Sequence, residues 1–194
     1  MTQSVRSVAV FCGSRVGYGP AHQAAAEALG RGIARAGLTL IYGGGSIGLM
    51  GVLADSALAE GGKVHGVIPD FLSQVERPHP GLSRLEMTKS MHERKARMFA
   101  LADAFVVLSG GFGTLDETLE IITWRQLGLH DKPILLIDVA GWARPLVALI
   151  DSVIAMGFAE PEHRRLFTVV PDVPAALTLL GVVRTETAAA EERF

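Results

Sequence analysis

The residues with the clearest potential for chemistry lie in a glycine-rich stretch near the middle of the chain, from Ser109 to Glu117. An apolar strand-like segment precedes this stretch and helical spacing follows it, so the glycines form a turn from a strand into a helix. Glycine lets the backbone approach a ligand, and the free N–H groups of a helix N-terminus favour an anion, usually phosphate. The sequence therefore predicts a phosphate-binding turn formed by Gly110, Gly111, Phe112, Gly113 and Thr114.

A carboxylate, Glu117, stands beside this turn, in the segment predicted as the first turn of the helix. Two interpretations of Glu117 are open from the local sequence. The spacing of Thr114 and Glu117 fits a capping box, in which both residues close the helix N-terminus and take no part in chemistry. In the other interpretation, Glu117 lies next to the bound ligand and stabilises positive charge that develops on it.

A second candidate region is the predicted helix that begins after Ser90 and carries Arg94, Lys95 and Arg97. Positive charge in the first turns of a helix opposes the helix dipole, and a nearby anion would offset that cost. The alternative is a solvated face on which Glu93 and Arg97 form an exposed i,i+4 pair, worth only ~0.3–0.5 kcal/mol. Arg94 and Lys95 are therefore candidates for contact with an anionic ligand.

The elements that would position these residues are alternating strands and helices. Strands are predicted at 7–12, 38–42, 64–68, 85–88, 104–108, 133–137 and 168–170, and helices at 20–36, 47–58, 90–98, 115–126, 145–156 and 173–180. The strands are apolar throughout, which is typical of a parallel sheet covered by helices on both faces. We expect one α/β domain over residues 1–182, with an irregular loop at 70–83 and a frayed C-terminal tail at 183–194.

Glycine turns follow the first, second and fifth predicted strands. All three lie at the carboxyl edge of the sheet, where such sheets bind their ligands. The first turn contains Gly13 and Ser14, and the second runs from Gly43 to Ser46, which is also predicted to cap the next helix. Three such turns exceed the needs of packing and indicate a ligand of nucleotide size.

The composition argues against several other classes of protein. The formal net charge is −2 and no block of Lys and Arg occurs, so binding of nucleic acid is not expected. The single cysteine, Cys12, fits a reducing compartment, and with no signal peptide or membrane span recognised the predicted location is the cytoplasm. The six histidines show no metal-binding spacing and no G-x-S-x-G elbow occurs, so neither a metal site nor a serine nucleophile is expected.

Several motifs in this chain stand in the order found in one family. They are Phe11-Cys12-Gly13-Ser14, Tyr42-Gly43-Gly44-Gly45-Ser46-x-Gly48-Leu49-Met50-Gly51, Met91-His92-Glu93-Arg94-Lys95-x-x-Met98, Gly110-Gly111-x-Gly113-Thr114-x-x-Glu117 and Thr123-Trp124-x-Gln126-Leu127-Gly128. Together they closely resemble the Lonely Guy family, the cytokinin riboside 5′-monophosphate phosphoribohydrolases, over residues 5–181. Members have often been labelled lysine decarboxylases, but the chain shows no lysine-anchored cofactor signature.

The resemblance implies a Rossmann-like fold and a homodimer whose active site lies near the subunit interface. It implies hydrolysis of the N-glycosidic bond of an adenosine-type 5′-monophosphate, giving the free base and ribose 5-phosphate, with no cofactor. Carried over onto this sequence, Arg94 and Glu117 would be the catalytic residues. The substrate-binding residues would be Ser14, Gly44, Gly45, Ser46, Glu76, Met91, Lys95, Gly110, Gly111, Phe112, Gly113, Thr114 and Thr123.

One position departs from the family pattern, since Ser109 stands where the family usually has proline, which would stiffen the turn. Two other functions remain as alternatives. One is a non-catalytic carrier of a nucleotide or cofactor, because some relatives with the glycine turn bind molybdenum cofactor. The other is a nucleosidase of broader specificity for nucleotides. The charged residues Arg94 and Glu117 favour the enzyme, since a carrier needs no carboxylate beside the ribose.

Overall fold

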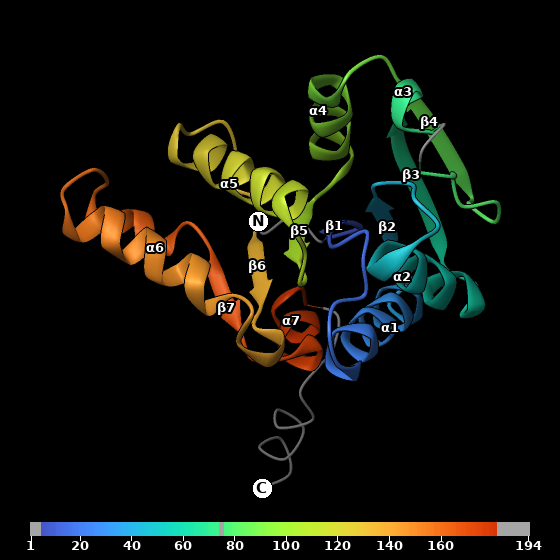
Figure 1. The fold of residues 1–194 in the computed structure, drawn as a ribbon, viewed down its shortest axis with the longest axis horizontal. Coiled ribbons are helices and arrows are strands. Elements are labelled where there is room, and N and C mark those ends of the chain that lie inside the picture. Colours follow the sequence, from blue (N-terminus) through green and yellow to red (C-terminus); the bar gives the residue numbers. More distant parts are fainter. Residues whose placement is uncertain (1–4, 74–75, 182–194) are drawn as a thin grey trace, which may run out of the picture.

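The computed structural model describes residues 5–73 and 76–181, and it contains one seven-stranded parallel sheet (Figure 1). The strand order is β4-β3-β2-β1-β5-β6-β7. Every neighbouring pair in this order is parallel. The strands are β1 (Ser7–Phe11), β2 (Thr39–Tyr42), β3 (Lys63–Pro69), β4 (Arg84–Thr88), β5 (Ala104–Val107), β6 (Ile134–Ile137) and β7 (Thr168–Val170).

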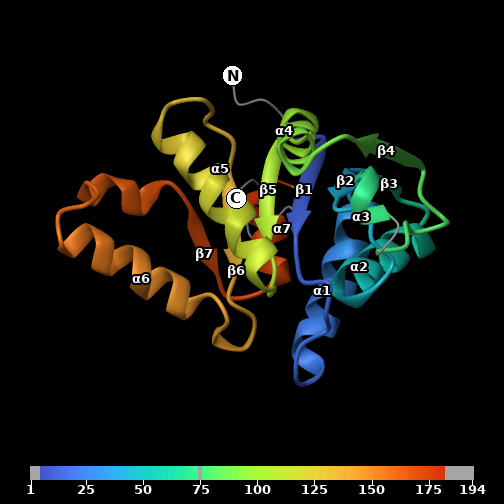
Figure 2. The same cartoon turned by 45° about the horizontal axis from the view of Figure 1, so that its top comes forward.

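Helices cover both faces of the sheet, as Figures 1 and 2 show, so the predicted fold class is confirmed. One face carries α1 (Pro20–Arg35), α2 (Gly48–Ala59) and α7 (Val173–Leu179). The other face carries α4 (Met91–Leu101), α5 (Phe112–Gln126) and α6 (Arg144–Ala155). The remaining elements are the short helix α3 (Asp70–Ser73) and the 3₁₀ turns η1 (Val139–Gly141) and η2 (Pro161–Arg165).

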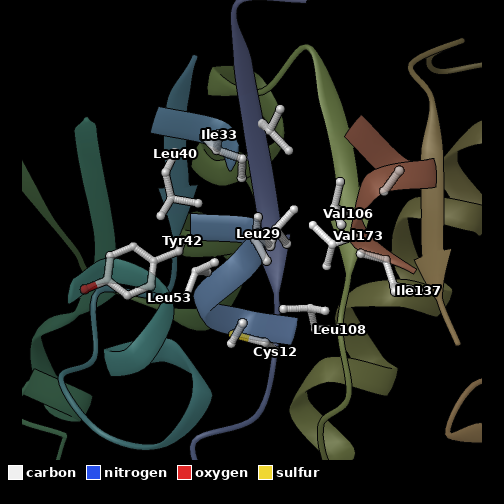
Figure 3. Close-up of a cluster of buried hydrophobic side chains, with 14 of the residues drawn as sticks. Cys12, Leu29, Ile33, Leu40, Tyr42, Leu53, Val106, Leu108, Ile137 and Val173 are labelled. Carbon is white, nitrogen blue, oxygen red and sulfur yellow. The ribbon is translucent and has the colours of Figure 1, made fainter. Parts of the chain in front are cut away.

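Alternate residues of the central strand point into the two layers, as the period of a strand requires. Val8 and Val10 of β1 pack under α1 and α2, while Ala9 and Phe11 face the opposite layer. Figure 3 shows the first layer, where Leu29 of α1 lies over the strands beside Leu53 of α2 and Val173 of α7. Burial of each such Leu, Ile or Val side chain stabilises the folded state by about 1.5–3 kcal/mol. The packing therefore holds the strands in place, and with them the turns at their carboxyl ends.

Three local predictions need correction. Helix α5 begins at Phe112, with Gly111 at its N-cap, three residues before the predicted start at Leu115. Helix α2 has Ile47 at its N-cap, so Ser46 does not cap it. The predicted loop at 70–83 contains the short helix α3. The predicted tail at 183–194 lies outside the described residues, and among those described no helix is both long and apolar enough to cross a membrane.

Candidate active site

The turns after β1, β2 and β5 meet at the carboxyl edge of the sheet. The Gly13 N–H donates to the Ser109 carbonyl at 3.0 Å, and the Leu49 N–H donates to the Gly13 carbonyl at 3.0 Å. A Cβ placed on Gly110 would lie only 2.9 Å from the Gly13 nitrogen, so this glycine permits the close approach of the two turns. β1 lies between β2 and β5, where the chain's connections switch direction, which is the usual ligand position in such sheets.

A cavity of about 210 Å³ opens at this edge and contains most of the predicted site residues. Its lining includes both predicted catalytic residues and apolar side chains from α2, α3 and α4. The predicted residues that line it are Ser14, Glu76, Met91, Arg94, Gly111, Phe112, Gly113, Thr114 and Glu117. Gly110 lines an adjoining cavity of about 530 Å³ that shares Gly13, Ser14, Gly111 and Phe112 with the first.

The N-terminus of α5 faces this cavity and has no side-chain cap. Counted from Phe112, Glu117 is the sixth residue of α5, so it lies in the second turn and not in the predicted first turn. Its carboxylate bonds to Arg94, so the capping-box interpretation of Thr114 and Glu117 is wrong. No side chain covers the N–H groups of the first turn, which is the arrangement that favours an anion.

Arg94 and Glu117 form a buried ion pair across α4 and α5. Arg94 Nη1 donates to Glu117 Oε1 at 2.7 Å, and each residue is only 7% exposed. The Arg94 Nε donates to the carbonyl of Val67 at 3.1 Å, which ties the guanidinium to the end of β3. With its charge balanced and its Nε and Nη1 atoms both hydrogen-bonded, the arginine fixes the carboxylate of Glu117 at the cavity wall.

Gly43, in the turn after β2, makes room for this pair. A Cβ on Gly43 would come within 2.3 Å of Arg94 Nη2 and 3.0 Å of Met50 Sδ. A side chain there would displace the guanidinium from the place where the Val67 carbonyl and the Glu117 carboxylate hold it. In the sequence, Gly43 is only one glycine of a turn. The structure shows that a glycine is needed there to leave room for the side chain of Arg94.

Burial and charge shift the pKa values of two groups in the cavity. Burial raises the pKa of Glu117 above the ordinary range of a glutamate, and the positive charge of Arg94 opposes the shift. Burial also raises the pKa of the Cys12 thiol, with a further contribution from the nearby Glu117 charge. Cys12 is therefore a protonated part of the cavity lining and not a nucleophile.

Five predicted site residues line neither of these two cavities. Lys95 pairs with Asp116 at 3.1 Å and with Glu120 at 3.0 Å, and Thr123 is exposed and donates to the Leu119 carbonyl. Their contact with substrate stays a prediction. The other three, Gly44, Gly45 and Ser46, belong to the turn after β2 and contact the loop that carries Glu76. In particular, the Ser46 Oγ donates to the Arg77 carbonyl.

The alternative interpretation of helix α4, an exposed i,i+4 pair of Glu93 with Arg97, is wrong. Arg97 does not pair with Glu93 but binds Glu86 of β4 through two nitrogen atoms. Glu93 instead accepts from the Lys89 N–H at 2.8 Å, while its own N–H donates to the Ser90 cap at 3.1 Å. The two arginines of α4 thus face different surroundings, since Arg94 faces the cavity and Arg97 faces the edge strand β4.

Sequence reasoning missed several residues around the site. Phe11, Gly13, Met50, Leu72 and Met98 line the cavity but were not among the predicted site residues. All of them except Leu72 stand in the motifs shared with the family, where an apolar or small side chain does not show whether it packs in the core or meets a ligand. Among the described residues, no group of three or more His, Cys, Asp or Glu could hold a metal ion.

The fold and the site define a Rossmann-like α/β protein with a glycine turn, an uncapped helix N-terminus and a buried Arg–Glu pair at the switch point of its sheet. A family model described as "Possible lysine decarboxylase" matches residues 50–180. The cytokinin riboside 5′-monophosphate phosphoribohydrolase of Rhodococcoides fascians is 44% identical over 176 residues, covering 90% of this chain and 89% of the relative. The chain belongs to the Lonely Guy family of phosphoribohydrolases.

Plant relatives match to a similar degree. The cytokinin riboside 5′-monophosphate phosphoribohydrolase LOG of Oryza sativa subsp. japonica is 43% identical over 166 residues, covering 86% of this chain and 69% of the relative. Among solved structures, the molybdenum cofactor binding protein of Rippkaea orientalis has a TM-score of 0.69 at 18% identity, covering 93% of this chain and 98% of that one. At that identity the likeness concerns the fold alone.

Proposed function

We propose that this protein hydrolyses the N-glycosidic bond of adenosine-type nucleoside 5′-monophosphates, releasing the free base and ribose 5-phosphate. The buried Arg94–Glu117 pair at the wall of the cavity, beside the uncapped N-terminus of α5, is the observation that carries this proposal. The named relatives at 43–44% identity support the reaction, since they carry the name of a phosphoribohydrolase.

The glycine turn and the first turn of α5 bind the 5′-phosphate. Their backbone N–H groups have no side-chain cap, and the positive end of the α5 dipole favours an anion there. Ser14 lines the same cavity from the turn after β1 and supplies a hydroxyl donor. This arrangement predicts that the phosphate is an obligatory part of the substrate.

The ribose then lies within reach of Glu117. As the bond from C1′ to the base nitrogen breaks, its electron pair leaves with the base and the ribose becomes oxocarbenium-like. A negative carboxylate held by Arg94 stabilises that charge, or orients the water whose oxygen bonds to C1′. The water gives up one proton and the base gains one, so the step needs no other reactant. An arginine stays protonated in proteins, so Arg94 orients and balances charge and does not transfer a proton.

The rest of the cavity is suited to the base. Met50, Leu72, Met91 and Met98 give it an apolar lining, and flexible methionine side chains adapt to different flat ligands. Glu76 lines the same cavity and is available to accept hydrogen bonds from the ribose hydroxyls or the base. The substrate is thus a small nucleotide, and the charge balance of the chain supports no role for nucleic acid.

The active unit is a homodimer, and the supporting observation is a set of exposed apolar side chains on α5 and α6, on one side of the sheet. Leu119 of α5 and Leu149, Val153 and Met156 of or next to α6 are exposed. Both helices belong to the same layer (Figures 1 and 2), and several exposed apolar side chains on one side of a protein favour a protein–protein interface there. Thr123, also exposed on α5, lies in the same region of the chain. The single buried cysteine supports a cytoplasmic location.

The carrier function is the second candidate, because solved molybdenum cofactor carriers share this fold, such as the protein from Chlamydomonas reinhardtii with a TM-score of 0.68 at 22% identity. Incubation of the purified protein with AMP, isopentenyladenosine monophosphate and adenosine, followed by chromatography of the free base, separates the two functions. We expect base release from both monophosphates and at least tenfold less from adenosine. Binding without release would favour a carrier, and equal kcat/KM for AMP and adenosine would contradict the phosphate site.

A further inference from the structure

Ser109, the residue just before the glycine turn, is held by a side chain from near the N-terminus of the chain. Ser109 is buried, and its Oγ lies 2.8 Å from Nδ1 of His22, which precedes it by 87 residues. His22 stands in the first turn of α1, on the opposite layer of the sheet from α5. A buried hydroxyl bonded to a side chain of another layer restrains the backbone that carries it.

Two further hydrogen bonds hold the same segment. The Ser109 carbonyl accepts from the Gly13 N–H at 3.0 Å, and the Gly110 carbonyl accepts from Trp142 Nε1 at 3.1 Å. Space around Gly110 is also tight, since a Cβ there would lie 2.0 Å from Thr114 Oγ1. A displacement of Ser109 would therefore pass directly to Gly110, Gly111 and the first turn of α5.

His22 does not reach the cavity that contains Glu117. It lines the adjoining cavity of about 530 Å³, together with Ser109, Gly110 and Trp142, on the outer side of the glycine turn. Any effect of His22 on the substrate must then pass through Ser109, which makes it a positioning residue and not a catalytic one.

We propose that His22 and Ser109 form a positioning pair that holds the glycine turn in register for the substrate phosphate. The hydrogen bond does in this chain what ring closure would do with proline at position 109, the residue usual in the family. Proline restrains its own φ angle, whereas the serine hydroxyl is restrained from outside by the imidazole. The inference rests on the proposed function, because it assigns the turn to the phosphate of a nucleoside monophosphate.

The pair predicts a loss of affinity that depends on the phosphate. Removing the hydrogen bond with His22→Ala or Ser109→Ala should raise the Kd and KM for AMP about tenfold, on the scale of one hydrogen bond, and change kcat less than about twofold. The affinity for adenosine should stay the same, because adenosine makes no contact with the turn. The double variant should be no weaker than either single variant, since both remove the same bond.

Two substitutions test whether the bond itself matters. His22→Asn keeps a polar atom at the place of Nδ1 and should restore the parent affinity for AMP. Ser109→Pro, combined with His22→Ala, should also restore it by restraining the turn through the ring. His163→Ala serves as the matched control, because His163 makes a local bond to the Glu160 N–H on η2 and lines neither cavity.

The experiment is calorimetric titration of AMP and adenosine into each variant, with base release measured separately. Parent-like binding of AMP by His22→Ala, an equal loss for adenosine, or additive effects in the double variant would overturn the inference. If His22→Ala does not fold, Ser109→Ala carries the same comparison from the other side of the bond. A parent protein that binds AMP but releases no adenine would contradict the proposed function and leave the binding comparison intact.

Discussion

The most direct test of the site is Glu117→Gln, which removes a charge and keeps the shape of the side chain. In the parent, Glu117 Oε1 accepts from Arg94 Nη1 at 2.7 Å, and both side chains are more than nine-tenths buried. Breaking a buried ion pair by removing one partner costs ~3–5 kcal/mol, because the other charge stays buried without its counterion. The glutamine oxygen still accepts the hydrogen bond, so we expect a loss of about 3 kcal/mol, at the lower end of that range.

For a chain of this length, that loss corresponds to a fall in Tm of about 6–12 °C, so the variant stays folded at 25 °C. Turnover should still fall, although the variant stays folded. Loss of a well-placed electrostatic group costs ~10²–10³ in kcat, because the charge that develops on the ribose loses its partner. Melting and AMP hydrolysis are measured on the same sample.

Glu120→Gln is the matched control on the same helix. Glu120 pairs with Lys95 at 3.0 Å, but its side chain is 23% exposed and lies outside the cavity lining. Its loss should cost under ~1 kcal/mol and leave kcat unchanged. A second comparison is the double change of Arg94→Met with Glu117→Leu, which removes both buried charges and should recover stability without recovering activity. Parent-rate hydrolysis by Glu117→Gln, or a Tm equal to that of Glu120→Gln, would refute the reasoning.

Three further predictions follow from the same geometry. Gly43→Ala should displace Arg94 and lower kcat by ~10² or more, whereas the fold persists, as circular dichroism would show. If Glu117 acts as the carboxylate, burial, which raises its pKa, should make kcat/KM fall on the acid side at a pH above the ordinary pKa of glutamate. An acid limb at or below that ordinary pKa would count against the proposed role. Leu119→Asp, at a site 41% exposed on α5, should convert dimer to monomer in light scattering, while Leu179→Asp, 57% exposed on α7, should not; a parent monomer at micromolar concentration would contradict the proposed interface.

Most of the fold follows from local patterns in the sequence. The continuous apolar strands, such as Ala104–Val107, predict a parallel sheet covered on both faces, and the structure confirms this for the inner strands, whereas the edge strand β4 is mostly exposed. The three glycine turns do lie at one edge, because parallel strands all end on the same side. Helix starts are harder to predict, since tertiary contacts decide them. Glycines at 111 and 113 disfavour helix locally, yet α5 begins at Phe112 because Gly110 is held between Gly13 and Thr114.

The site was predictable as a set of residue types and not as an arrangement. Arg94 and Lys95 look equivalent in the sequence, but successive residues on a helix point about 100° apart. One therefore faces the cavity and the other faces Asp116 and Glu120 on the outside of α5. The pairing of Arg94 with Glu117 depends on β5, which lies between α4 and α5 in the sequence and sends both helices to the same face of the sheet.

The role of Glu117 shows how a small shift in a helix start decides chemistry. A capping box places its acidic residue three positions after the cap, so a helix capped by Thr114 would hold Glu117 at its own N-terminus. With the cap at Gly111 instead, Glu117 moves into the second turn, too far along the helix to return to the cap. Its carboxylate is then free to meet Arg94, and the N–H groups that it would have covered are left for an anion. The same spacing in the sequence serves both arrangements, and the packing of the glycine turn against the turn after β1 selects the one that leaves a carboxylate near an uncapped helix N-terminus.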